Sequence, residues 1–91
     1  MGCGFVPPRQ RPRDRAVVVA FGQRVRQLRR AAALTQEGLS EAAGLHATFI
    51  SNVERGYRTP TLSTMLRLAN GLGVTLAELV EGLEDAIADE A

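Results

Sequence analysis

The 91-residue sequence contains a single cysteine, Cys3, and a single histidine, His46. One cysteine cannot form an intramolecular disulfide, and no cluster of cysteines and histidines has the spacing of a zinc site. No apolar run approaches the length that a bilayer span or a signal-peptide core requires. We therefore expect a cytoplasmic protein that binds neither a metal ion nor a membrane.

The groupings of residues on which most catalysis depends are also missing. The sequence has no paired histidine and carboxylate, no nucleophile beside an evident base, and no glycine loop that would cradle a phosphate. Its length suits one small domain, which leaves no room for a second domain that would bind a small-molecule effector. We expect a protein that is not an enzyme and that needs no cofactor.

Lysine is absent as well: all eleven basic residues are arginines, and none lies beyond Arg67. The end of the sequence is acidic instead, so the formal net charge of +1 conceals a gradient along the chain. A basic front and an acidic end fit a nucleic-acid-binding surface kept apart from an acidic tail. Two ordinary solvated faces would give the same distribution.

The stretch over residues 36–55 is typical of two short helices joined by a tight turn at Gly44. In the second helix, Phe49, Ile50 and Val53 share one apolar side at about 100° per residue. The opposite side carries Ala47, Thr48, Ser51, Asn52 and Arg55. Because short hydroxyl and amide side chains can approach base edges in the major groove of DNA, we interpret this second helix as a recognition helix.

Helices are also predicted on both sides of this pair. The first runs from near Asp14, a suitable N-cap, to about Ala32. A fourth helix is predicted over residues 62–71. The residues expected to face the core from it are Leu62, Met65, Leu66 and Ala69. A fifth begins at Thr75, which forms a capping-box pattern with Glu78.

Composition divides the chain into three parts. Residues 1–13 combine prolines, glycines and arginines with almost no apolar periodicity, which predicts a flexible basic arm. Such an arm can also touch phosphates or a minor groove. Residues 14–82 form the expected helical domain. Residues 83–91 form an acidic tail, which extends the fifth helix unless Gly82 ends it.

Four fragments occur in a characteristic order and spacing between Phe21 and about Val80. They are FGQRVRQLRR, LTQEGLSEAAGL, FISNVERG and TPTLSTMLRLANGLGVTLAEL. In this arrangement the chain resembles the Cro and phage-repressor type of helix-turn-helix domain, the xenobiotic-response-element regulators. The resemblance implies an all-α, five-helix lambda-repressor-like fold. It also implies a transcriptional regulator that binds double-stranded DNA as a homodimer on a two-fold-related operator.

The resemblance also implies roles for particular residues. Base-reading positions are Ala47, Thr48 and Asn52, and Ser51 shares their face of the helix. The residues expected at phosphates are Gln36, His46, Arg55 and Arg58. Arg29 is expected to pair with Glu54 in an architectural ion pair, because a lone carboxylate at the edge of an apolar face is costly to bury. One departure from the usual pattern is Ala33, where many members have glycine.

The fifth helix carries an apolar stripe with more apolar surface than the core of a five-helix monomer would bury. The stripe begins at Leu76, and we expect four of its later residues to form a dimer interface: Leu79, Val80, Leu83 and Ile87. Two functional alternatives remain open. Antitoxins and restriction–modification controllers use similar small domains. A protein-interaction module that has lost DNA binding would explain why Arg55 and Arg58 are the only cations near the recognition helix.

Overall fold

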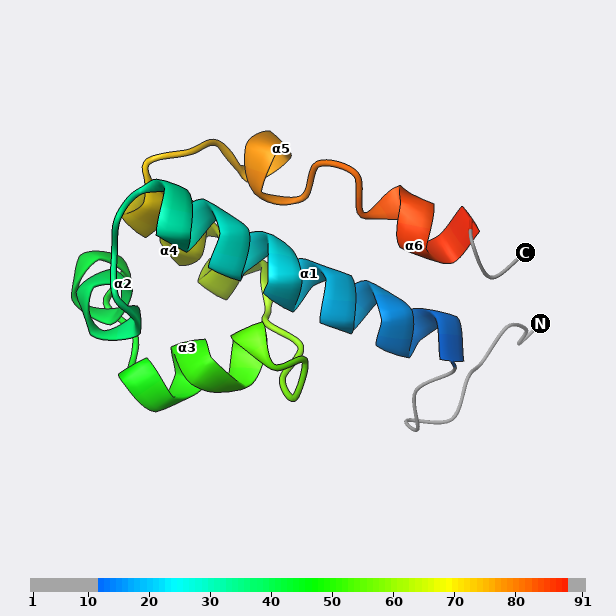
Figure 1. Ribbon diagram of the computed structural model, residues 1–91, viewed down its shortest axis with the longest axis horizontal. Coiled ribbons are helices and arrows are strands. Elements are labelled where there is room, and N and C mark those ends of the chain that lie inside the picture. Colours follow the sequence, from blue (N-terminus) through cyan, green and yellow to red (C-terminus); the bar gives the residue numbers. More distant parts are fainter. Residues whose placement is uncertain (1–11, 89–91) are drawn as a thin grey trace.

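The computed structural model describes residues 12–88, and within them every regular element is a helix (Figure 1). The helices are α1 (Pro12–Ala31), α2 (Gln36–Ala43), α3 (Ala47–Glu54), α4 (Leu62–Leu72), α5 (Leu76–Leu79) and α6 (Glu84–Ala88). The predicted all-α, five-helix architecture is confirmed, and α6 follows it as a further short helix. None of these helices, over residues 12–88, is long and apolar enough to cross a bilayer.

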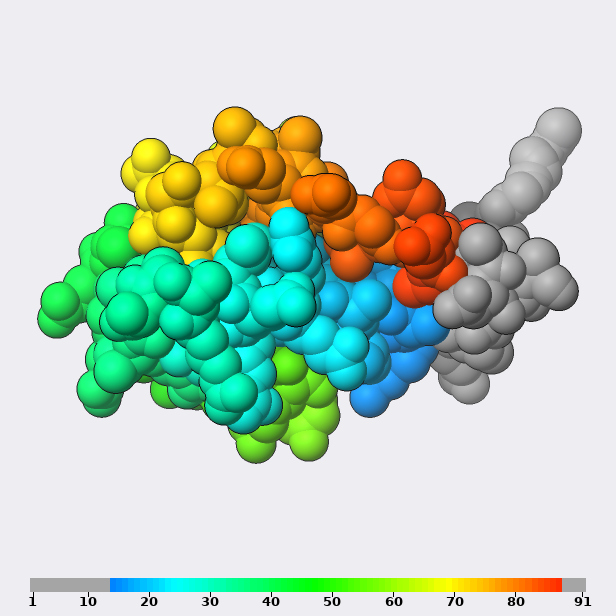
Figure 2. Space-filling view, turned by 45° about the horizontal axis from the view of Figure 1, so that its top comes forward, coloured from blue at the N-terminus to red at the C-terminus, as the bar shows by residue number. Residues whose placement is uncertain are grey.

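The long helix α1 forms the spine of the molecule. In Figure 1, α3 lies along one side of α1 and α5 and α6 lie along the other, while α2 crosses near its end. Figure 2 shows the same arrangement, with the segment from α5 to α6 forming a ridge beside α1. Every helix from α1 to α5 contributes to one core. Its largest fully buried side chains are Val25, Leu39, Ile50, Val53, Leu68 and Leu79.

Helix α1 begins two residues before the predicted start. Proline is tolerated at Pro12 because the first N–H groups of a helix have no partner within it. Asp14 is therefore not the N-cap but a first-turn residue, where its charge is favourable beside the positive end of the helix dipole. The predicted arm loses its last two residues to α1, and its residues 1–11 lie outside the described part of the chain.

The predicted core face of α4 is partly wrong. Ala69 is buried and Met65 packs against the core, but Leu62 and Leu66 are 61% and 50% exposed. Leu68 and Leu72 take their place in the core. Since α4 is apolar on more than one side, its sequence alone did not identify which side turns inward.

Helix α5 does not extend past Gly82. It ends at Leu79, and Gly82 has a φ of 84°, a left-handed conformation in which glycine is unstrained. The chain turns there and begins again as α6. The capping box that was predicted for Thr75 and Glu78 is present, with the Glu78 carboxylate accepting from the Thr75 backbone N–H at 2.8 Å.

Ala33, two residues after the end of α1, adopts a left-handed conformation with a φ of 60°. An L-residue there is strained by about 1–2 kcal/mol, and glycine would remove this strain at some cost in chain entropy. We expect Ala33→Gly to raise the free energy of unfolding by about 0.5–1 kcal/mol. Urea denaturation measures this change, and an unchanged or lower midpoint would contradict it.

Candidate nucleic-acid interface

Helix α3 presents one buried and one outward side, as the sequence predicted. Ile50 and Val53 are fully buried in the core. The turn before α3 contains Gly44, whose left-handed φ of 71° ends α2 and redirects the chain. On the outward side, Thr48 is exposed and three residues are half-buried: Ala47, Ser51 and Asn52. The structure thus brings the four predicted base-reading residues together on a short polar face.

The start of α3 lacks a side-chain cap. His46 occupies the N-cap position in an extended conformation, but its imidazole makes no capping hydrogen bond. It is exposed beside the polar face. By contrast, Thr35 caps α2 by accepting from the N–H of Gly38 at 2.9 Å. The two helices of the motif therefore begin with different degrees of local restraint.

The predicted ion pair between Arg29 and Glu54 is present and holds the end of α3 to α1. Arg29 Nε lies 2.6 Å from Glu54 Oε2, and Arg29 Nη2 donates to Oε1 at 3.1 Å. The two side chains are only 11% and 3% exposed. The hydrogen bond to Glu54 raises the pKa of Arg29 above its ordinary value, against the opposing effect of burial.

Two further groups complete the polar network around this pair. Arg29 Nη1 donates to the carbonyl oxygen of Leu34 at 2.8 Å. Gln36 Nε2 donates to Glu54 Oε1 at 3.1 Å. The Gln36 side chain, predicted at a phosphate, is thus linked to the ion pair. Its amide keeps a second N–H that this bond does not use.

The arginines near the end of α3 contact aromatic rings. The guanidinium of Arg55 lies 4.7 Å from the centre of the Tyr57 ring, and that of Arg58 lies 5.5 Å from the Phe49 ring. Arg55 Nη2 also donates to Asn52 Oδ1 at 3.1 Å. Sequence analysis missed Tyr57, which is 61% exposed. An aromatic residue two positions after an arginine was the available signal.

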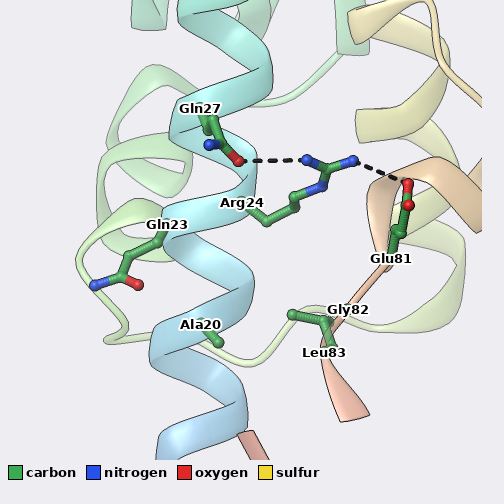
Figure 3. Close-up of a pocket in the computed structure, with 7 residues that line it drawn as sticks. All are labelled: Ala20, Gln23, Arg24, Gln27, Glu81, Gly82 and Leu83. Atoms are coloured by element: carbon green, nitrogen blue, oxygen red, sulfur yellow. Dashed lines mark hydrogen bonds and ion pairs between the residues drawn. The ribbon is translucent and has the colours of Figure 1, made fainter. Parts of the chain in front are cut away.

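A hollow of about 300 Å³ lies elsewhere, between α1 and the α5–α6 turn (Figure 3). Arg24 reaches across it, with Nε and Nη2 donating to the carbonyl oxygen of Glu78 at 3.1 and 2.7 Å. It also lies 3.6 Å from the Glu81 carboxylate and donates to Gln27. These contacts join the end of α5 to α1, and the carbonyl oxygen of Glu78 also accepts from the backbone N–H of Glu81 at 3.4 Å.

One residue predicted for the dimer interface lies in the core instead. Leu79 is fully buried, so its side chain belongs to the core and has no surface left for a partner. Val80 and Leu83 are partly buried against the core, and Ile87 is 45% exposed. The stripe seen in the sequence thus mixes core and surface positions, since the chain changes direction at Gly82.

A capped helix, a tight turn and a second helix with a polar outer face define a helix-turn-helix domain. The profile of the helix-turn-helix family matches residues 25–79. The chain belongs to this family, and the resemblance stated from the four fragments is confirmed.

Relatives and solved structures agree with this assignment. The chain is 42% identical over 67 residues to the control protein C.SmaI of Serratia marcescens. The aligned region covers 71% of this chain and 80% of C.SmaI. It is 42% identical over 59 residues to the uncharacterized HTH-type transcriptional regulator y4dJ of Sinorhizobium fredii. That match spans 65% of this chain and 77% of the regulator. The restriction-modification controller protein C.AhdI from Aeromonas hydrophila matches with a TM-score of 0.69 and 44% identity, over 70% of this chain and 97% of that chain.

Proposed function

We propose that the protein is a sequence-specific transcriptional regulator that binds double-stranded DNA through α3. The observation that carries this proposal is the outer face of α3, which is short-chained, polar and uncharged until Arg55. Such a face can enter a major groove and form hydrogen bonds with base edges. The names of the relatives, which include a transcriptional regulator and control proteins, support the same function.

In this function the two kinds of contact come from different residues. Thr48, Ser51 and Asn52 provide hydrogen bonds to bases, and Ala47 packs against a thymine methyl group. The residues that bind phosphates are Gln36, His46, Arg55 and Arg58. Phosphate contacts fix the register of the protein on the duplex but choose no base.

Selection of bound duplexes from a random pool, using the full chain, tests this function. We expect one enriched sequence with inverted half-sites. Its affinity should fall with salt at a log–log slope of about −0.9 for each phosphate neutralised. A chain that enriches no sequence and shows no salt-dependent binding is instead an interaction module with the same fold.

Alanine substitutions at Asn52 and at Arg58 should change DNA binding in different ways. Asn52→Ala should weaken binding to the selected site by about 1–3 kcal/mol and relax the preference at one base pair. Arg58→Ala should weaken binding to all sequences alike and flatten the salt slope. Titrations against selected and scrambled duplexes measure both effects. If Asn52→Ala keeps the wild-type affinity ratio, Asn52 does not read sequence.

We also propose that the protein acts as a homodimer, through a surface revised from the sequence prediction. Without Leu79, its apolar members are Val80, Leu83 and Ile87, together with the exposed Leu62 and Leu66 on α4. An apolar hollow of about 200 Å³ lies beside them, and Leu83 lines it together with Met65 of α4 and residues of α1. Two-fold symmetry would present two recognition helices about 34 Å apart, one turn of duplex.

Leu66→Glu should convert this dimer to a monomer, because two-fold symmetry would bury the new charge twice in an apolar interface. Sedimentation equilibrium measures the change. Ala42→Glu is the control, since Ala42 is exposed on α2 and lies outside this surface. A chain truncated after Gly82 separates the contribution of α6. If Leu66→Glu dimerises like the wild type, α4 is not part of the interface.

A narrower role as a restriction–modification controller is favoured by one observation. Both the control protein C.SmaI and the controller C.AhdI cover most of this domain at more than 40% identity. In that role, the selected operator should lie in the promoter of an endonuclease gene beside the gene for this chain. If the operator lies only at unrelated promoters, the chain is a regulator of another kind.

A further inference from the structure

Asn52, the side chain best suited to read a base, is not alone on its face of α3. Arg55 Nη2 donates to its Oδ1 at 3.1 Å. The same guanidinium lies 4.7 Å from the centre of the Tyr57 ring. The planar guanidinium of Arg55 therefore has an aromatic ring as one neighbour and a base-reading amide as another.

The chemistry of this contact fixes which way round the Asn52 amide lies. A guanidinium has only donors, so the amide atom that faces Arg55 must be the acceptor, which is the oxygen. The reversed amide would set N–H groups against N–H groups. The two N–H donors of Asn52 are consequently directed to the other side of the amide.

Amide orientation decides what an asparagine can read. In a bidentate pair with adenine, the oxygen accepts from N6 and the NH₂ group donates to N7, so the order of the two atoms must match the base. An amide oxygen has two lone pairs, so Asn52 Oδ1 can accept from Arg55 and from a base together. An amide fixed before binding also loses less rotational freedom when the complex forms.

We propose that Arg55 is a positioning residue for sequence readout: it holds the Asn52 amide in one orientation, while Tyr57 holds the Arg55 guanidinium. This inference rests on the proposed DNA-binding function. Arg55 has five N–H donors and uses one on Asn52, so its other donors remain for a phosphate. In this proposal, Arg55 links the recognition of a base by Asn52 to the binding of the DNA phosphate backbone.

A purely phosphate-binding Arg55 and a positioning Arg55 predict different measurements. Loss of a phosphate contact weakens binding to every sequence by the same factor. Loss of the positioning contact weakens discrimination at the one base pair that Asn52 reads. The ratio of affinities for two duplexes that differ at this base pair therefore separates the two roles.

The experiment uses the full chain and two duplexes. The first is the selected operator. The second is the same operator with a different base pair at the position where the Asn52→Ala variant has lost its preference. Wild type should prefer the first by about tenfold or more. Arg55→Met should lose most of this preference. Adding Arg55→Met to Asn52→Ala should reduce the preference no further, because both substitutions remove the same contact.

Tyr57 provides a matched pair of variants. Tyr57→Phe keeps a ring under the guanidinium and should keep the preference, whereas Tyr57→Leu should reduce it. The proposal is overturned if Arg55→Met weakens both duplexes equally and keeps the wild-type ratio, or if Asn52→Ala changes no base preference. Those results leave DNA binding intact. If the wild type selects no duplex at all, the proposed function itself has failed.

Discussion

Glu54→Ala should lower the free energy of unfolding by about 3–5 kcal/mol, because it leaves the Arg29 charge buried and unpaired. The two side chains are only 11% and 3% exposed, so the Arg29 charge is largely removed from solvent. Gln36 Nε2 would lose its acceptor as well. Chemical denaturation measures the change. A domain of this size has a total stability of only about 5–15 kcal/mol, so the effect is large.

A double variant provides the control for this prediction. Arg29→Met combined with Glu54→Leu removes both charges and leaves apolar side chains in their place. Such replacements of buried pairs are often neutral or stabilising. We expect the double variant to be more stable than Glu54→Ala. If the free energy of unfolding of Glu54→Ala instead lies within about 1 kcal/mol of the wild-type value, the ion pair contributes no more than an exposed one.

Gly22→Ala should destabilise the fold although it replaces glycine with the best helix former. Gly22 lies inside α1, where the backbone of α3 comes close to it. A methyl group there would overlap the carbonyl oxygen of Val53 and lie 2.9 Å from that of Glu54. Overpacking of this kind costs about 1–3 kcal/mol or more, against the gain of about 0.5–1 kcal/mol in helix propensity. Thermal and urea unfolding measure the net change.

Gly73→Ala is the comparison for this substitution. A methyl group at Gly73 meets nothing within 4 Å, so only its left-handed φ of 74° opposes the change. We expect Gly22→Ala to be the more destabilising of the two. A Gly22→Ala variant more stable than the wild type would show that α3 can move away from α1 at no cost, and its DNA selectivity would then report whether that movement matters.

The sequence predicted those parts of the structure that local chemistry dictates. Helix α3, the turn at Gly44 and the capping box at Thr75 all follow from residue type and period, and the ion pair of Glu54 with Arg29 followed from family resemblance. Each of these features has a signal within a few residues or an established pattern. They place the polar face of α3 correctly relative to the core.

Other features depend on contacts between distant segments and could not be predicted. Leu62, Leu66, Leu68 and Leu72 are chemically alike, and only the packing of α4 on its neighbours separates exposed from buried positions. Leu79 was misplaced because only the packing of α5 on its neighbours shows which side chains of the stripe are buried. The contact of Arg55 with Asn52 depends on side-chain geometry, which residue spacing alone does not specify.

The two ends of α3 differ in ways that bear on how such a protein changes over evolutionary time. Its last turn is joined to α1 by a backbone contact at Gly22 and by a buried ion pair, so most substitutions there affect folding. Its first turn has no side-chain cap at His46, and Thr48 is exposed. Substitutions at the exposed His46 and Thr48 are nearly free of a stability cost. New operator preferences can therefore arise at the start of α3 while its far end keeps the domain folded.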